Sequence, residues 1–521
     1  MVLPNTTLKN AWDDFHLSDG DIEFIYSYLL EKETPLPAAE LLEAVIVNRI
    51  KTEKEALLKK TQGKGKVYLP KDSYEVDEEL VFPGFNWKNG KVVEIRDGFN
   101  PELEAFKVIK VKFDDGKEME LASEISEHTL NTSLDLIGED PAFDKERVLS
   151  EHKEEFLDSV EDTLVKNEDL VQIAGAWFPR ALLVDINVGY LNLIEAILEE
   201  ANGGPLTTTD LMAQIELNTS ENQKLTEFSM NLALQEDDRF DEVGPSGEVL
   251  WYLHHMEPED VKRKPIFLNY DPITINNPTV KGYLETFEGT IADDLEENIQ
   301  ADGDDSVTMS LLFPHWRTGT IPLSRQVEKI FPTAIESPRI RFVFRDEATD
   351  ETFNGWVVRK DGYVYGLSEW YENNGLIPGS LVTVSKTDTP GEILIRSEKS
   401  RQNKEWMKTV LVGADKGVVF AMLKHPVEAD FSERMAIAIP DVATLDAVWK
   451  ERNGVKPEKV FMLIARELAK LNPQGHIHAQ EMYAAVNVIF RCPPSPVLDF
   501  LLTNPAIDHL GDLYFHIKEG D

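Results

Sequence analysis

The chain has 521 residues, of which 42% are apolar and 28% are charged, a composition that is typical of globular proteins and excludes wholesale disorder. One hydrophobic core cannot serve a chain of this length, so we expect about three to five domains. The single cysteine, Cys492, excludes an internal disulfide and multi-cysteine zinc or iron–sulfur sites, and it favours a reducing, cytoplasmic location. Neither a signal peptide nor a membrane-spanning apolar run is expected.

Charge is the most unusual property of the sequence. The 94 acidic residues exceed the 53 basic ones and give a net charge of -41. Such a charge repels polyanions, so any nucleic acid would have to be bound by local basic patches. The composition is compatible with an enzyme, with an interaction scaffold, or with a nucleic-acid binder whose charge is segregated by domain.

Three nine-residue stretches align without gaps and indicate an internal repeat. The stretches are TPLPAAELL from Thr34, GPLTTTDLM from Gly204 and GHIHAQEMY from Gly475. Each follows an amphipathic helical run, and each contains an apolar residue followed by an acid four positions later. These pairs are Leu36 with Glu40, Leu206 with Asp210, and Ile477 with Glu481. Thr207 and Asp210 predict a capping box at the start of a helix.

The repeats also share an ending of short alternating strands turned around glycine, as in RFDEVGPSGEVLWYL and AIDHLGDLYFHI. Helix, turn, helix, helix and hairpin is the order of a winged helix. We therefore predict winged-helix-like units at 17–70, 186–256 and 455–517, within domains 1–72, 186–258 and 455–521. A truncated or divergent unit is expected near 141–183, within a helical domain at 129–185.

The unit at 186–256 resembles the HARE-type winged helix known from the delta subunit of bacterial RNA polymerase. The resemblance rests on its second helix and on the ending RFDEVGPSGEVLWYL, and it covers about 70 residues. It implies a role in transcription or around chromatin-like DNA, and no catalytic residues.

Residues 49–71 form a local basic patch in this acidic chain. This stretch contains two acidic residues and eight basic ones. The basic residues are Arg49, Lys51, Lys54, Lys59, Lys60, Lys64, Lys66 and Lys71. Nucleic-acid contacts are expected at Lys59, Lys60, Lys64 and Lys66. An equally good interpretation is a solvated helix face whose positive charge complements a neighbouring acidic surface.

Short strands separated by Gly, Asn and Asp turns follow in residues 74–122 and predict an SH3-like β-barrel in domain 73–128. Such a barrel binds either proteins or nucleic acids. Residues 259–310 form an acidic connecting segment. Its nine acids between 285 and 305 are Glu285, Glu288, Asp293, Asp294, Glu296, Glu297, Asp302, Asp304 and Asp305. A solvated linker or helix surface is favoured there over a metal-binding loop.

Alternating strands in residues 311–396 predict a barrel of about seven strands with two short helices. The motifs IPLSRQVEKIFP, expected to be a helix flanked by strands, RDEATDETFNGW and GLSEWYENNGLIPGSLVTV resemble the DNA-binding pseudobarrel of plant auxin-response factors and restriction-enzyme effector domains. The resemblance implies two arms that grip the major groove. One arm would consist of His315, Trp316, Arg317 and Thr318, and the other of Arg359 and Lys360 next to Asp361.

This pseudobarrel, domain 311–400, departs from the family because its arms carry less lysine and because Asp361 and the upstream acids would repel DNA. Its aromatic and basic residues also have interpretations without DNA. Trp316 and Trp370 are suited to the barrel core. Arg317, Arg339, Arg341 and Arg345 could equally pair with nearby carboxylates.

No phosphate loop, nucleophile elbow or zinc signature occurs in the sequence, so we expect no enzyme activity, cofactor or metal. His476 and His478 are explained by the start of a repeat helix, and His254–His255 and Cys492 have no evident catalytic partner. A β-rich connecting region is predicted at 401–454.

The sequence therefore predicts an α+β, multidomain chain of winged-helix-like units, an SH3-like β-barrel and a central β-pseudobarrel. The favoured function is DNA binding or transcription regulation without catalysis, with double-stranded DNA, RNA polymerase or another protein as partners. The alternative is an acidic scaffold that binds proteins and no nucleic acid.

Overall fold

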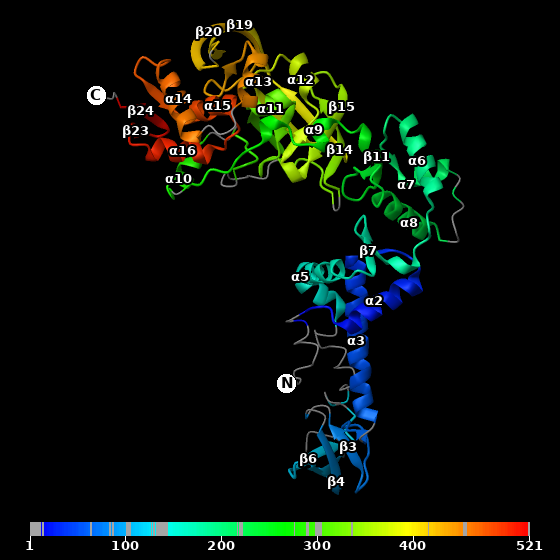
Figure 1. The fold of residues 1–521 in the computed structure, drawn as a ribbon. Coiled ribbons are helices and arrows are strands. Elements are labelled where there is room, and N and C mark those ends of the chain that lie inside the picture. Colours follow the sequence, from blue (N-terminus) through cyan, green and yellow to red (C-terminus); the bar gives the residue numbers. More distant parts are fainter. Residues whose placement is uncertain are drawn as a thin grey trace. The chain divides into compact units, whose positions relative to one another are not determined.

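The computed structural model has mixed α/β architecture with several separate sheets (Figure 1). It describes residues 12, 15–62, 65–82, 85, 88–99, 106–126, 128, 131, 144–215, 217, 222–275, 277–287, 291–296, 305–334, 337–414, 416–451 and 456–518. Within these ranges, no helix has both the length and the apolar content needed to cross a membrane. Two compact units are present, one of residues 1–185 with 218–230 and one of residues 186–217 with 231–521.

The first compact unit contains what we term the N-terminal repeat. Its helices are α2 (Asp19–Lys32), α3 (Ala38–Gln62) and α5 (Lys145–Val165), and its strands are β1 (Leu36–Pro37), β7 (Leu170–Ile173) and β8 (Ala176–Pro179). The strands form one sheet in the order β1-β8-β7. Pairing of β1 with β8 joins the segments predicted as two units, 17–70 and 141–183, into one.

A five-stranded sheet is inserted between α3 and α5, in the order β2-β3-β4-β5-β6. Its strands are β2 (Lys66–Val67), β3 (Glu79–Phe82), β4 (Lys88–Asp97), β5 (Lys107–Phe113) and β6 (Glu118–Ser123). Alternate residues of β3, β4 and β5 point into a small core that includes Phe82, Val92 and Val111. The strands predicted in residues 74–122 are confirmed.

The middle repeat and the C-terminal repeat have the same order of elements. The middle repeat consists of α6 (Val188–Glu200), β9 (Leu206–Thr207), α7 (Thr208–Gln214), α8 (Gln223–Gln235), β10 (Phe240–Glu242) and β11 (Leu250–Leu253). The C-terminal repeat consists of α14 (Pro457–Ala469), β22 (His476–His478), α15 (Ala479–Ile489), α16 (Pro494–Thr503), β23 (Ile507–Gly511) and β24 (Tyr514–Ile517). Their sheets have the orders β9-β11-β10 and β22-β24-β23.

The three repeats also share a strand register. The apolar residue that aligns in the sequence lies opposite a buried aromatic residue of the last strand in every case. These pairs are Leu36 with Trp177, Leu206 with Trp251, and Ile477 with Phe515. Because a slip of one residue would turn the aromatic side chain out of the core, this pair fixes the register of each sheet.

The helix that follows the first strand begins at the predicted position in the middle repeat. Thr207 is the N-cap of α7, and its hydroxyl accepts a hydrogen bond from the backbone N–H of Asp210 at 3.1 Å. The same hydroxyl lies 2.7 Å from the Asp210 carboxylate. The hydroxyl half of the predicted capping box, the N-cap at Thr207, is therefore confirmed.

Replacing Thr207 with alanine is expected to lower the local stability of α7 by about 1 kcal/mol, since the first-turn amide loses its acceptor. Hydrogen exchange of the amides in residues 208–214 measures this change. The exposed neighbour Thr209 provides the control, and Thr209→Ala should change protection by less than about 0.5 kcal/mol. Equal effects of the two variants would contradict the capping role.

A seven-stranded sheet that curls into a half-barrel forms the centre of the second compact unit, in the order β12-β17-β18-β14-β15-β16-β13. The strands are β12 (Ser306–Ser310), β13 (Thr320–Pro322), β14 (Arg339–Asp346), β15 (Thr352–Val358), β16 (Tyr363–Tyr365), β17 (Leu381–Lys386) and β18 (Glu392–Ser397). Two short helices, α11 (Phe313–Thr318) and α12 (Ser368–Asn373), accompany them. The predicted helix in IPLSRQVEKIFP is wrong, because this segment is strand β13 followed by turns.

Both faces of the half-barrel sheet are covered at strand β15. Val357 belongs to the interior core, whereas Trp356 and Val358 pack with Val243 and Tyr252 of the middle repeat. The backbone N–H of Arg341 also donates to the Val243 carbonyl at 2.9 Å. The middle repeat and the half-barrel therefore share a core.

The predicted connecting region at 401–454 is a long β-hairpin followed by a helix. The hairpin consists of β19 (Lys399–Val412) and β20 (Val418–Ala429), and β21 (Ile437–Ala438) and α13 (Val442–Glu451) follow. Val410, Val418 and Phe420 of the hairpin lie in the same core as the C-terminal repeat. This packing places the hairpin beside α14 and α15 (Figure 1).

The segment from 259 contains α9 (Glu259–Lys262), a 3-10 turn at Ile266–Leu268, and α10 (Val280–Leu284). Its apolar residues Phe267, Val280, Leu284 and Ile291 are buried in the core with the C-terminal repeat. A solvated linker is therefore the wrong description of these described parts.

Candidate functional site

The first predicted arm lies in helix α11, and two of its residues are in the protein interior. His315 is fully buried and Thr318 is 7% exposed. The Thr318 hydroxyl donates to the Pro314 carbonyl at 2.8 Å. Gly319 ends the helix at a φ of 63°, and a Cβ there would meet the backbone nitrogen of Ser368 at 2.5 Å. These side chains do not form a surface arm in this structure.

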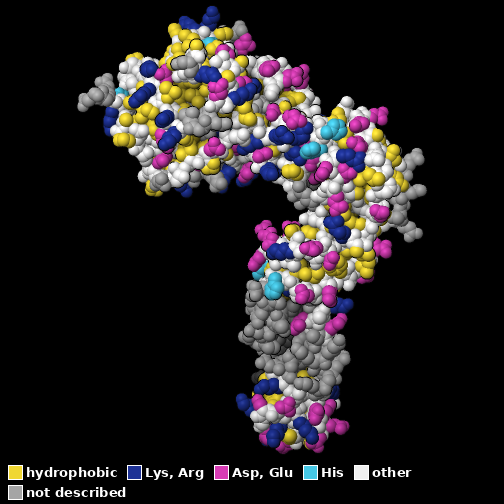
Figure 2. Space-filling model, viewed as in Figure 1, with side chains coloured by type: hydrophobic (Ala, Val, Ile, Leu, Met, Phe, Trp, Pro, Cys, Tyr) yellow, Lys and Arg dark blue, Asp and Glu magenta, His cyan; other side chains and the backbone are white. Residues whose placement is uncertain are grey.

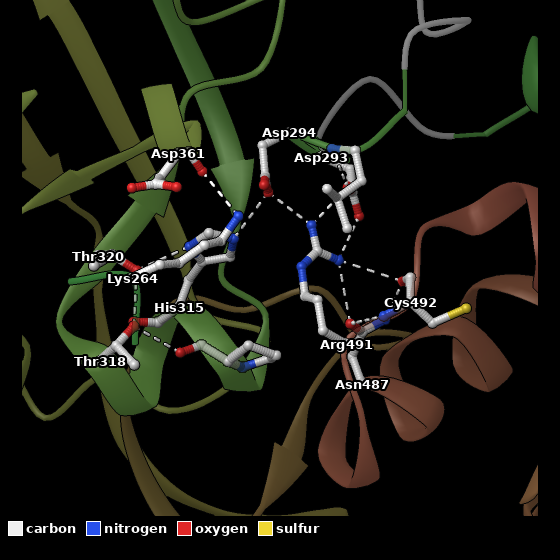
Figure 3. Close-up of polar contacts among 12 residues, drawn as sticks. Lys264, Asp293, Asp294, His315, Thr318, Thr320, Asp361, Asn487, Arg491 and Cys492 are labelled. Carbon is white, nitrogen blue, oxygen red and sulfur yellow. Dashed lines mark hydrogen bonds and ion pairs between the residues drawn. The ribbon is translucent and has the colours of Figure 1, made fainter. Parts of the chain in front are cut away.

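His315 belongs to a buried polar network that joins the half-barrel to the C-terminal repeat (Figure 3). Its Nε2 lies 3.3 Å from Asp294, which accepts a hydrogen bond from Arg491 at 2.7 Å. Arg491 also donates to both carboxylate oxygens of Asp293, at 2.6 and 2.9 Å. Tyr483 donates its hydroxyl proton to Asp293.

The ionisation states follow from these contacts. Burial raises the pKa of Asp294, but the Arg491 charge and the His315 hydrogen bond outweigh it and hold this pKa well below its usual range. Burial lowers the pKa of His315 despite Asp294, so the imidazole is neutral at pH 7. Because ionised Asp294 only accepts, His315 donates from Nε2 and accepts at Nδ1 from Thr320, 2.9 Å away.

This network corrects the prediction of a solvated acidic segment. Asp293, Asp294 and Glu296 are buried. Glu296 accepts hydrogen bonds from the hydroxyl and the backbone N–H of Ser495, in the first turn of α16. Glu288, Glu297, Asp302 and Asp304 lie outside the described residues. The buried acids attach this segment to the C-terminal repeat, so their role is structural.

The other residues of the first arm also have internal partners. Arg317 forms a two-pronged ion pair with Asp446, at 2.7 and 3.0 Å, and its guanidinium lies over the Phe267 ring. The Trp316 indole N–H donates to the Leu376 carbonyl at 2.8 Å. The predicted alternative of pairing with carboxylates is confirmed for Arg317.

In the second arm, Arg359 and Lys360 differ. Arg359 is half-buried and donates to the Pro332 carbonyl at 2.7 Å, and burial lowers its pKa. Lys360 is exposed. Trp370 is 6% exposed and donates its indole N–H to Asp346, so the prediction of a barrel-core aromatic is confirmed.

Two further arginines of the half-barrel are paired as the alternative predicted. Arg339 lies 2.8 Å from Asp241, and Arg345 lies 3.0 Å from Glu392. Arg341 packs its guanidinium over Tyr252.

The predicted basic patch of the N-terminal repeat is described only in part. Lys59 and Lys60 lie in α3, but their side chains are outside the described set, as is Lys64. Lys66 is exposed, lies 3.7 Å from Asp72 and sits over the Tyr74 ring. Arg49 forms an ion pair with Asp21 at 2.6 Å.

The third helix of each repeat carries no basic face. Helix α5 carries three basic residues and seven exposed acidic residues. The acidic residues are Glu146, Glu151, Glu154, Glu155, Asp158, Glu161 and Asp162. Helix α8 has a single lysine, Lys224, and α16 is largely buried. On the face shown in Figure 2, basic and acidic side chains are interspersed.

A pocket of about 410 Å³ lies between the long hairpin and the C-terminal repeat. We term it the hairpin pocket. Its apolar lining is Trp406, Met407, Met422, Phe431, Ala436, Leu468, Leu471 and Pro473, and its charged lining is Glu405, Lys408, Glu433 and Glu481. Trp406 is 62% exposed and Met422 is 38% exposed, an unusual exposure for such large apolar side chains.

Lys408 is the buried basic residue in the lining of the hairpin pocket. Its ammonium group donates to the carbonyls of Glu433 and Arg434 at 3.1 and 2.7 Å, and to the Glu481 carboxylate at 3.2 Å. Burial lowers its pKa, and Glu481 opposes this shift. Three acceptors satisfy all three N–H groups, so Lys408 holds the hairpin against α15 rather than serving as a free amine.

The charge of the hairpin pocket is negative. Three carboxylates line it against one lysine, and Glu481 is the carboxylate that pairs with that lysine. Lys424 lies on the strand opposite Trp406, with its ammonium 5.2 Å from the indole ring. The Trp406 ring therefore already contacts one cation of the chain itself.

Metal-ligating side chains gather at another place. Within the described parts of the chain, the group capable of holding a metal is Asp241, His254 and Glu257, which is not part of the hairpin pocket. His478, considered as a metal ligand in the sequence, is the N-cap of α15 and accepts from the Gln480 N–H.

No family model, curated protein or solved structure matches this chain. The hairpin pocket was not predicted from the sequence. Its one local signal is Trp406 and Lys408 in a predicted β-rich region, on strand positions two apart and hence on one face.

Proposed function

We propose that the chain is a non-enzymatic interaction scaffold that binds a basic segment of a partner protein in the hairpin pocket. Three winged-helix-like repeats, an SH3-like sheet and the pseudobarrel form the framework. The observation that carries the proposal is the pocket itself, whose lining combines an exposed tryptophan with three carboxylates, one of which, Glu481, pairs with Lys408. Aromatic faces and carboxylates together favour lysine and arginine side chains.

The charge distribution favours a protein partner over DNA. The chain carries a net charge of -41, and the arginines predicted to contact DNA have intramolecular partners in Asp446 and the Pro332 carbonyl. A winged-helix protein enters the major groove with a helix, and the helix before the hairpin of the N-terminal repeat, α5, presents seven exposed acids. Backbone phosphates would be repelled by this face.

The proposal is tested by the binding of fluorescent lysine-rich peptides to the full chain, compared with a matched library in which every lysine is glutamine. We expect the lysine peptides to bind more tightly. Trp406→Ala should weaken their binding at least about fivefold, since an aromatic anchor of an interface contributes roughly 1 kcal/mol or more.

The matched control is Phe99→Ala, because Phe99 is 91% exposed and lies outside the pocket. This variant should bind the lysine peptides like the unchanged chain. Equal binding by the Trp406 variant would remove the pocket from the proposal. Salt-sensitive binding of random duplex DNA that is lost in Arg317→Ala with Arg359→Ala would favour the DNA hypothesis instead.

A further inference from the structure

A second cluster of polar groups lies where the middle repeat meets the half-barrel. Asp241 is on β10, and His254 and Glu257 follow β11. One potential ligand atom from each residue lies within 4.8 Å of the others. The side chain of Glu257 is fully buried, that of Asp241 is 16% exposed and that of His254 is 42% exposed. The cluster therefore has a closed side and an open side.

Glu257 is the unusual member of this cluster. The residue is 3% exposed, yet no amine, amide or hydroxyl group of the described residues donates a hydrogen bond to either of its carboxylate oxygens. A buried carboxylate without donors is costly. Arg339 approaches it only to 3.4 Å and lies closer to Asp241, at 2.8 Å.

The charges of the cluster do not balance. Asp241 and Glu257 would carry two negative charges, and Arg339 carries one positive charge. A bound cation would neutralise the remaining negative charge.

We propose that Asp241, His254 and Glu257 bind a divalent transition-metal ion, with Zn²⁺ as the best match. Zinc takes imidazole nitrogen and carboxylate oxygen at about 2.0–2.2 Å, which in a tetrahedral site places ligand atoms roughly 3.3–3.6 Å apart. His254 Nδ1 lies 3.6 Å from a Glu257 oxygen, so these two are already at ligand spacing. The Asp241 ligand atom lies within 4.8 Å of the other two, so it has to move closer by at most about 1.5 Å to reach the spacing of a tetrahedral site.

A bound metal would connect β10 to the residues after β11, because its three ligands come from these two places. Arg339, on β14, contacts both carboxylates, and the Glu257 oxygen that it contacts is the one that lies 3.6 Å from His254. The ion would therefore take over the Glu257 oxygen that Arg339 now contacts.

The proposal is tested by titrating Zn²⁺ into the full chain after treatment with a chelator, with isothermal titration calorimetry as the readout. We expect one site in the unchanged chain, and binding weakened by roughly tenfold or more in His254→Ala. His255→Ala is the matched control, since His255 is the next residue, is exposed and is not part of the cluster. It should bind Zn²⁺ as tightly as the unchanged chain.

A second variant guards against a change in folding. Glu257→Gln keeps the size of the side chain and removes the acid, so it should also lose the site while circular dichroism remains unchanged. Visible absorption of bound Co²⁺ reports the coordination geometry directly. Absence of Zn²⁺ binding by the unchanged chain, or equal binding by the His254 and His255 variants, would overturn the proposal.

Discussion

Arg491→Met is expected to lower the free energy of local unfolding around α15 and α16 by about 3–5 kcal/mol, because it leaves two buried carboxylates without their cation. Arg491 is fully buried, and its guanidinium donates to Asp293 and Asp294 at 2.6–2.9 Å. Methionine fills most of the volume of the arginine side chain, so the loss of stability is chiefly electrostatic. Hydrogen exchange of the amides in residues 479–503 measures it segment by segment.

The matched control is Arg317→Met, which also breaks a two-pronged arginine–aspartate pair. The Arg317 and Asp446 side chains are 36% and 18% exposed, so water takes over part of their solvation. We expect Arg317→Met to lower the free energy of local unfolding by about 1 kcal/mol or less. If both variants cost the same, the buried network does not hold the C-terminal repeat.

Trp251→Ala is expected to destabilise the middle repeat by about 3–5 kcal/mol, since it removes one of the largest buried side chains and leaves a cavity. Trp251 is 1% exposed, and its indole N–H lies 3.0 Å from the Thr208 hydroxyl and 3.2 Å from the Asn231 carboxamide oxygen. It also pairs with Leu206, the aligned residue of the repeat. Hydrogen exchange of β9 to β11 measures the effect.

Two comparisons make this prediction specific. Trp251→Phe should cost less than the alanine variant, because the ring remains and Thr208 still donates to Asn231. Trp406→Ala should change stability by less than about 1 kcal/mol, because Trp406 is 62% exposed. A small effect of Trp251→Ala would show that the aromatic partner does not fix the sheet register.

The sequence predicted those parts of the fold that depend on local patterns. Leu36, Leu206 and Ile477 aligned without gaps because each begins the same strand, opposite an aromatic residue. Alternation likewise predicted β14 and β15. The N-terminal repeat was not predicted as one unit, because the five-stranded sheet separates β1 from its partner β8 by more than a hundred residues.

The polar sites were harder to predict because they depend on distant partners. Asp293 and Asp294 belong to an acidic run, and their buried partner Arg491 lies 198 and 197 residues away. A dense acidic run normally indicates a solvated surface, and no local sequence pattern predicts that Arg491 is its partner. His315 and Arg317 looked like arm residues for the same reason, since Asp294 and Asp446 are distant in sequence.

The central claim, that the hairpin pocket binds a basic protein segment, is tested most directly by methyl spectra of the full chain labelled at methionine. Met407 and Met422 line the pocket, whereas Met119 is 41% exposed and outside it. Addition of the lysine-rich peptides should shift the signals of Met407 and Met422 and leave Met119 unchanged. Unchanged pocket signals, with shifts produced by duplex DNA instead, would contradict the scaffold proposal.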